Sequence, residues 1–160
     1  MPVNQTRPAP DLPEGRLYLR EEELDRAVDL IFAATRRFWR SAEGALTANG
    51  LGPAHYRALA AIRRSEGLPV SALLTRLDVR KQSLARVLAD LEKAQMILRE
   101  PGEEDRRQRL LSLTAAGREA EREATAALRE RLAQVFRLAG ADAVAGARTV
   151  LGALAAEDGL

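Results

Sequence analysis

The sequence contains no cysteine and a single histidine, His55. Without cysteine there are no disulfides, thiolate metal sites or thiol-based oxidant sensors. One histidine is too few for a two-histidine zinc motif. Only six side chains are aromatic, which argues against a protein that stacks single-stranded bases. No apolar run approaches the roughly 18 residues of a membrane span, and the N-terminus lacks a hydrophobic signal segment. We therefore expect a cytoplasmic protein with no membrane contact, metal or cofactor.

Charge is nearly balanced over the 160 residues, with 25 basic and 23 acidic side chains. Its distribution is uneven, because residues 57–114 hold twelve basic and eight acidic residues and the remainder has two more acidic than basic residues. Nearly all the basic residues are arginine, whose planar fork suits phosphates and guanine edges, although a GC-rich genome would also favour arginine. The middle third is expected to be the electropositive part.

Apolar spacing predicts helices at both ends of the chain. Four prolines in the first 16 residues predict a flexible arm over 1–16, and the segment 17–50 is expected to hold one long helix from about 18 to 47. Two more helices are expected in segment 115–160. Their apolar faces have no obvious partner in a domain of this size, so we expect these terminal segments to dimerise.

The segment 51–114 has the spacing of a helix-turn-helix motif followed by a hairpin. After a helix over about 53–65, a short helix is expected to begin with Ser71 as its cap and to end at a turn in which Asp78 tolerates left-handed backbone. A longer helix over about 81–94 follows, and then two short strands flank a polar turn. A hairpin directly after a helix-turn-helix is a wing.

The residues of this hairpin carry a recognisable pattern. Asp105-Arg106-Arg107, a strand, and then Leu113-Thr114-Ala115-Ala116-Gly117 resemble the wing signature of the MarR family of bacterial winged helix-turn-helix regulators. Leu91-Glu92-Lys93 also fits, and the resemblance covers residues 24–154, including features of an alphaproteobacterial, PetP-like subgroup.

Two positions depart from the family pattern. Gln95 stands where members usually have glycine after the recognition helix, so that helix is expected to end differently. Arg80 replaces the usual Ser or Thr cap, which adds charge and weakens the cap.

The resemblance implies a mainly α fold with a small β-wing, in which a winged helix-turn-helix lobe joins a helical dimerisation lobe formed by the N- and C-terminal helices. It also implies a homodimer that binds double-stranded DNA sequence-specifically at a pseudo-palindromic operator, as a repressor. The effector it implies for many members is a small aromatic or phenolic anion.

Nine residues are candidate DNA contacts. The first turns of helix 81–94 would enter the major groove, where Gln82 can pair with adenine and an arginine with guanine. By resemblance, Arg107 would insert into the minor groove, oriented by Asp105. Arg76 and Ser71 are expected to contact phosphates. A solvated surface and an ordinary ion pair are the alternative interpretations. The nine are Ser71, Arg76, Arg80, Lys81, Gln82, Ser83, Arg86, Asp105 and Arg107.

A possible effector site lies where the first predicted helix ends and the next begins. An arginine and a histidine beside aromatic rings could hold a carboxylate, although core packing explains the aromatics equally simply. The candidates are Phe38, Trp39, Arg40, His55 and Tyr56.

We expect no catalysis. The acidic clusters 21–23 and 103–105 suit a helix start and a wing tip, not a buried acid–base pair, and no nucleophile elbow, phosphate loop or metal spacing is present. The remaining alternative is a helical dimeric interaction protein with a vestigial winged helix.

Overall fold

The computed structural model describes residues 20–102 and 106–156, so the predicted arm over 1–16 and the candidate Asp105 lie outside the described residues. Within these ranges the chain forms seven helices and three short strands, which confirms the mainly α fold with a small β-wing. The chain divides into two compact units, Met1–Ala34 and Thr35–Leu160.

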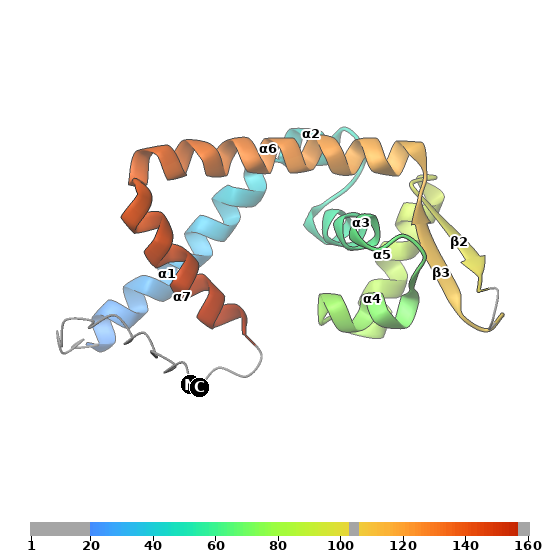
Figure 1. Cartoon of the computed structure of the whole chain (residues 1–160), viewed down its shortest axis with the longest axis horizontal. Coiled ribbons are helices and arrows are strands. Elements are labelled where there is room, and N and C mark those ends of the chain that lie inside the picture. Colours follow the sequence, from blue (N-terminus) through green and yellow to red (C-terminus); the bar gives the residue numbers. More distant parts are fainter. Residues whose placement is uncertain (1–19, 103–105, 157–160) are drawn as a thin grey trace, which may run out of the picture. The chain divides into compact units, whose positions relative to one another are not determined.

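The elements follow one another in an order typical of a winged helix (Figure 1). They are α1 (Glu21–Arg40), α2 (Glu43–Thr47), α3 (Pro53–Arg64), β1 (Leu68–Pro69), α4 (Val70–Leu77), α5 (Lys81–Lys93), β2 (Ile97–Pro101), β3 (Arg109–Leu113), α6 (Ala115–Ala139) and α7 (Ala141–Ala155).

The prediction of one long helix over 18–47 is wrong, because α1 ends at Arg40 and α2 begins at Glu43. The Ser41 hydroxyl donates to the Phe38 carbonyl, and such a local bond competes with helix continuation. The break turns Ala42 and Leu46 into the core, where they are 0% and 3% exposed and where α2 packs on α6.

A three-stranded antiparallel sheet in the order β1-β3-β2 closes the lobe that α3, α4 and α5 build. The sequence missed β1, which is only two residues long and pairs Leu68 with Leu111. As expected from alternation, Leu111 and Leu113 face the core. The largest fully buried side chains are Leu59, Ile62, Leu73, Leu88, Leu91, Leu111 and Leu113.

Two non-glycine residues adopt left-handed backbone at the ends of α4 and α5. Asp78, with φ 47°, confirms the predicted turn. Gln95, with φ 56°, occupies the position after the α5 cap, where the Gln95 amide donates to the Glu92 carbonyl and the Met96 amide to the Leu91 carbonyl. These two bonds make the Schellman ending that glycine usually provides, so the helix ends as in the family pattern at some cost in backbone strain.

The expectation that Ser71 caps α4 is wrong. The N-cap is Pro69, whose extended backbone pairs with β3, and no side chain caps the helix. Because the strand runs directly into the helix, Ser71 falls inside the first turn, where its carbonyl accepts a hydrogen bond from Thr75.

Thr114 and Gly117 attach α6 to the end of α5. The Thr114 hydroxyl caps α6 by accepting from the Gly117 amide at 3.0 Å, and it donates to the Gln95 carbonyl at 2.8 Å. The Thr114 amide donates to the Met96 carbonyl at 3.0 Å. A Cβ on Gly117 would lie 2.0 Å from the Met96 oxygen, so only glycine permits this contact.

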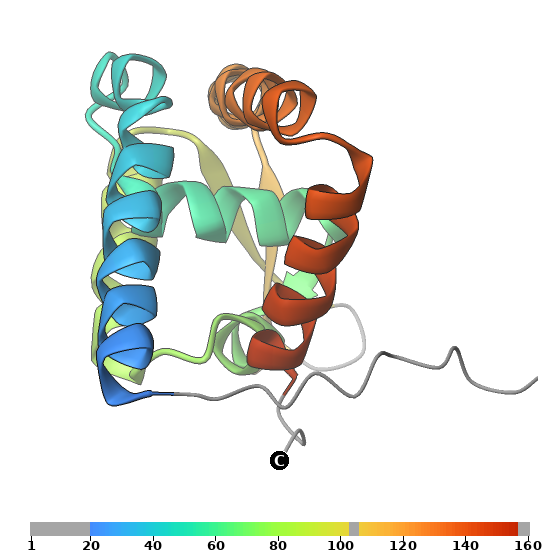
Figure 2. The ribbon, with the colours of Figure 1, turned by 90° about the vertical axis from the view of Figure 1, so that its left-hand side faces the viewer.

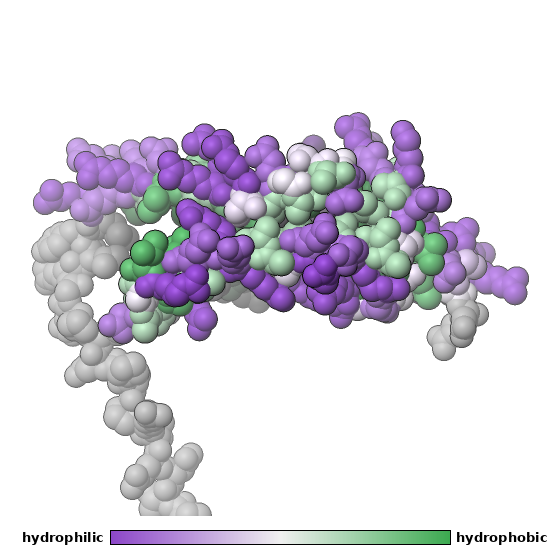
Figure 3. Space-filling view, turned by 90° about the horizontal axis from the view of Figure 1, so that it is seen from above, coloured by the Kyte–Doolittle hydropathy of each residue, from purple (hydrophilic) through white to green (hydrophobic). Residues whose placement is uncertain are grey.

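The two C-terminal helices differ in burial along their length. α6 is buried in places from Gly117 to Leu128 and then exposes apolar side chains, while α7 buries none. Gly140, with φ 83°, separates the two helices, and α7 leaves in a different direction (Figure 2). Hydrophilic side chains dominate the face seen from above, with smaller groups of hydrophobic residues between them (Figure 3).

We predict that Gly117→Ala destabilises the protein by about 3 kcal/mol, because the added methyl group must displace backbone atoms of Met96. Urea denaturation followed by circular dichroism, at equal protein concentrations, measures the change. The control is Gly44→Ala in α2, where the new Cβ meets nothing within 4 Å and alanine favours the helix. Equal stability of the two variants would contradict the prediction.

Candidate nucleic-acid interface and a neighbouring pocket

The start of α5 presents a polar, mainly basic surface. Leu84, Leu88 and Leu91 are buried on its inner side, which leaves the opposite side of its first turns to solvent. Five of the nine candidate DNA contacts are exposed at the start of α5, where the fold brings them together: Arg80, which precedes the helix, and Lys81, Gln82, Ser83 and Arg86 in its first turns.

Two arginines hold the helix-turn-helix against α3. Arg57 donates from Nη2 to the Leu77 carbonyl at 2.9 Å, at the end of α4. Arg76 donates from Nη1 to the Ala61 carbonyl at 3.2 Å and to the Ser65 hydroxyl at 3.1 Å. One nitrogen of Arg76, a predicted phosphate contact, is therefore engaged within the protein. Sequence reasoning missed Arg57, since nothing in its local pattern separates it from other surface arginines.

The wing and the start of α4 enclose a hollow of about 350 Å³. Ser71 and Arg107, two candidate DNA contacts from separate elements, both line it, and both residues are exposed. The other lining residues are Pro69, Val70, Arg99, Gln108 and Arg109.

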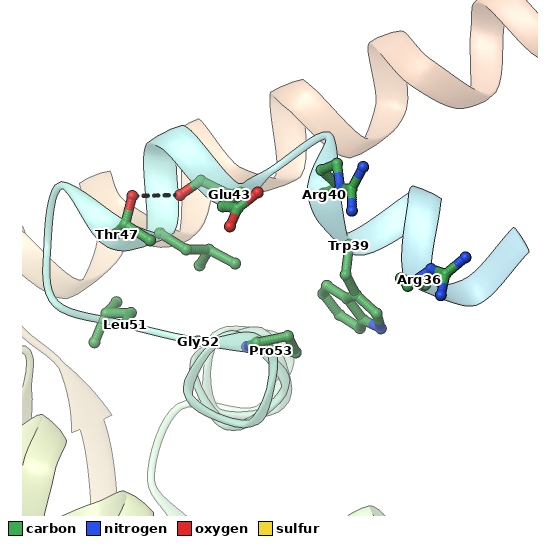
Figure 4. Close-up of a pocket in the computed structure, with 9 residues that line it drawn as sticks. Arg36, Trp39, Arg40, Glu43, Thr47, Leu51, Gly52 and Pro53 are labelled. Atoms are coloured by element: carbon green, nitrogen blue, oxygen red, sulfur yellow. Dashed lines mark hydrogen bonds between the residues drawn. The ribbon is translucent and has the colours of Figure 1, made fainter. Parts of the chain in front are cut away.

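A second cavity, of about 330 Å³, lies between the end of α1, α2 and the start of α3 (Figure 4). Of the five predicted effector contacts, only Trp39 and Arg40 line it, and the Trp39 ring hangs from α1 toward the start of α3. Arg36 lies one helical turn before them and was missed, although its spacing places it on the same helix face. The remaining lining residues are Glu43, Leu46, Thr47, Leu51, Gly52 and Pro53.

His55 has a structural role at the start of α3. Its Nδ1 accepts from the Gly52 amide at 3.0 Å, so a neutral His55 carries its proton on Nε2, which lies 3.3 Å from Asp90 Oδ2 on α5. Both ring nitrogens are thereby engaged, and His55 does not line the cavity.

Tyr56 joins a buried polar chain between α3 and α6. Thr125 donates to Glu121 at 2.7 Å, so the Tyr56 hydroxyl, 2.9 Å from Thr125 Oγ1, acts as a donor. Arg63 donates to the other Glu121 oxygen at 2.8 Å, which compensates a carboxylate that is only 5% exposed. The polar pair Glu121 and Thr125, four residues apart beside an alanine stripe, was a signal that could have been read.

The aromatic rings behind the cavity pack edge to face. Trp39 lies 5.7 Å from Tyr56 and 5.5 Å from Phe38, measured between ring centroids. Phe38 and Tyr56 thus support the Trp39 wall without lining the cavity, in agreement with the packing alternative for these two residues.

The one clear pKa perturbation among the described residues lies outside both sites. On α6, Arg122 donates hydrogen bonds to Glu119, which lowers the pKa of that carboxyl and raises the pKa of the guanidinium. No helix in the described ranges has the length and hydrophobicity to span a bilayer.

The fold and its exposed basic helix define a winged helix-turn-helix protein. A sequence model of the MarR family matches residues 49–108. The HTH-type transcriptional regulator PetP of Rhodobacter capsulatus is 40% identical over 141 residues, which cover 88% of this chain and 85% of PetP.

Solved structures share the fold. A mutant MarR from E. coli, complexed with operator DNA, gives a TM-score of 0.70 at 22% identity, covering 84% of this chain and 97% of that one. The transcriptional repressor CouR, bound to a 23-mer DNA duplex, gives a TM-score of 0.72 at 22% identity, and the match covers 86% of this chain and 99% of CouR.

The chain belongs to the MarR family and is a DNA-binding transcriptional regulator with a winged helix. Its similarity to PetP confirms the expected subgroup. Because the family consists of non-enzymatic regulators, the expectation that the chain is not an enzyme is also confirmed.

We predict that Thr125→Val and Tyr56→Phe each destabilise the fold by about 1 kcal/mol, since each removes a hydrogen bond from the chain that ends at buried Glu121. The double variant should lose less than the sum, because both changes remove the same Tyr56–Thr125 bond. Thermal and urea denaturation measure the cycle. Thr149→Val, on the exposed surface of α7, is the control and should change stability little. Strict additivity would contradict the coupling.

Proposed function

We propose that the protein is a homodimeric repressor that recognises a pseudo-palindromic operator in double-stranded DNA. The observation that carries this proposal is the division of α5, whose apolar side is buried while its first turns present Arg80, Lys81, Gln82, Ser83 and Arg86 to solvent. A helix of this kind can enter a major groove.

The candidate residues divide into three roles. Gln82 can pair bidentately with adenine, and the arginines and Lys81 can contact guanine or phosphate. Arg107, on the wing, is suited to a narrow A·T minor groove, and Asp105 is assigned to orient it. Ser71 and the free nitrogens of Arg76 are assigned to phosphates, which position the protein without specifying sequence. The structures of MarR and CouR with DNA support duplex DNA as the partner.

The homodimer is supported by apolar side chains that the described chain leaves exposed. Each of the terminal helices contributes exposed apolar side chains, and Leu138 is 88% exposed. Such exposure is costly unless another surface covers these side chains. A second copy would provide that surface, and its two α5 helices would read half-sites about 10 base pairs apart. The residues are Leu24, Val28, Leu30, Ile31 and Phe32 in α1, Leu132, Val135, Phe136 and Leu138 in α6, and Val150, Leu151 and Leu154 in α7.

The cavity beside Trp39 is the proposed effector site. Its volume of about 330 Å³ suits a small ligand, Trp39 offers an aromatic wall, and Arg36 and Arg40 offer positive charge. A small aromatic carboxylate would match all three features and would release the DNA. We place this regulation in the cytoplasm, where the chromosome lies.

The competing function is that of a helical dimeric interaction protein whose winged helix is vestigial. It predicts helical dimers without operator selectivity, which separates it from the proposal in any selection of genomic fragments.

We predict that Arg107→Ala weakens binding to genomic fragments selected by the wild-type protein by about 1–3 kcal/mol, because a minor-groove contact is lost. The dimer should stay intact, since Arg107 lies on the wing. Gel shifts and light scattering measure the two properties. Arg106→Ala, at the neighbouring exposed position, is the matched control. Equal affinities of the two folded variants would contradict the role of Arg107.

We predict that small aromatic carboxylates quench or shift the fluorescence of Trp39, the sole tryptophan, and release the bound DNA. Arg40→Ala and Arg36→Ala should each weaken ligand binding several-fold. Arg37→Ala, which alters an exposed residue of the same helix outside the cavity lining, should not. If no carboxylate of a broad panel changes fluorescence or thermal stability, this effector class is wrong.

A further inference from the structure

Three arginines converge on the hollow between the wing and α4. Arg99 comes from β2, Arg109 from β3 and Arg107 from the turn before β3, and no acidic residue of the described ranges lines the hollow of about 350 Å³ that they share. Arg99 Nε lies 3.7 Å from Glu92 Oε1, a loose ion pair. Arg109 makes no side-chain hydrogen bond or ion pair within the described ranges.

The strand register explains why these side chains face the hollow. Arg99 pairs with Leu111, and Arg109 pairs with Pro101, two residues along. Directly paired residues of antiparallel strands share a face, and Leu111 is fully buried, so Arg99 and Arg109 lie on the core-facing side of the hairpin. Leu98, on the opposite face, is 48% exposed.

This arrangement is the reverse of what folding alone favours. An apolar side chain faces water, while two cationic side chains occupy the inner face, where the hairpin extends beyond the core. Folding alone does not require arginines there, and they place positive charge on the described lining of the hollow.

We infer that this hollow binds a backbone phosphate of the DNA duplex, with Arg99 and Arg109 as its ligands. Guanidinium groups bind phosphate oxygens in bidentate fashion, and the Ser71 hydroxyl at the edge of the hollow adds another donor. The inference rests on the proposed function, because Ser71 and Arg107 belong both to this hollow and to the proposed DNA surface. A phosphate held here would fix the wing relative to α4, so that Arg107 meets the minor groove in register.

The test compares Arg99→Gln, Arg109→Gln and the control Arg122→Gln in the full-length protein. Arg122 lies on the exposed surface of α6, so its replacement removes the same charge outside the hollow. Binding to a random-sequence duplex of about 30 base pairs, roughly three helical turns, is measured against salt concentration. Each lost phosphate contact should lower the slope of log K against log salt by about 1.

The expected result is a lower slope and several-fold weaker binding for both hollow variants, on random and genomically selected duplexes alike, with Arg122→Gln unchanged. Thermal denaturation verifies that all variants are folded. Hollow variants that match Arg122→Gln, while the wild-type protein still binds DNA with a steep salt dependence, would overturn this inference and leave the proposed function intact. A wild-type protein without salt-dependent DNA binding would instead refute the proposed function.

Free anions are distinguished from the DNA backbone by inorganic phosphate titrated at constant ionic strength. Saturable stabilisation of the wild-type protein that Arg109→Gln abolishes, together with unchanged DNA slopes, would show that the hollow holds a free oxyanion and would overturn the backbone assignment.

Discussion

The close contact between Gly117 and the Met96 carbonyl determines how the parts of the winged lobe are joined. At this point the end of α5, the start of β2 and the start of α6 meet, and Thr114 ties all three with hydrogen bonds. α5 carries the polar surface proposed to read DNA, and α6 carries apolar surface proposed to dimerise. A dimer that reads two half-sites needs a rigid connection between them, and the absence of a side chain at residue 117 provides it.

Helix α3 is the second rigid element, because polar bonds along it reach most of the lobe. His55 faces Asp90 on α5, Arg57 holds the end of α4, and Arg63 and Tyr56 connect to α6 through Glu121 and Thr125. The cavity beside Trp39 adjoins the first residues of this helix. A ligand there would therefore contact the element that positions the proposed DNA-reading helix, without touching that helix itself.

Much of this could be predicted from sequence. Periodicity located the helices, and alternation located β3, because long amphipathic patterns report burial directly. The break at Ser41 and the strand at Leu68 were missed, because short elements depend on tertiary contacts that leave little local pattern. For the same reason, His55 and Tyr56 suggested a ligand site, yet each forms bonds to residues distant in the sequence. The positions of the arginines around the wing hollow follow from strand register, which sequence alone does not specify.

Footprinting on genomic fragments selected by the full-length protein tests the central claim most directly. A homodimeric operator reader should protect one pseudo-palindrome whose half-sites lie about 10 base pairs apart, centre to centre. Selection of no common sequence by a folded dimer would contradict the account and favour a helical interaction protein with a vestigial winged helix.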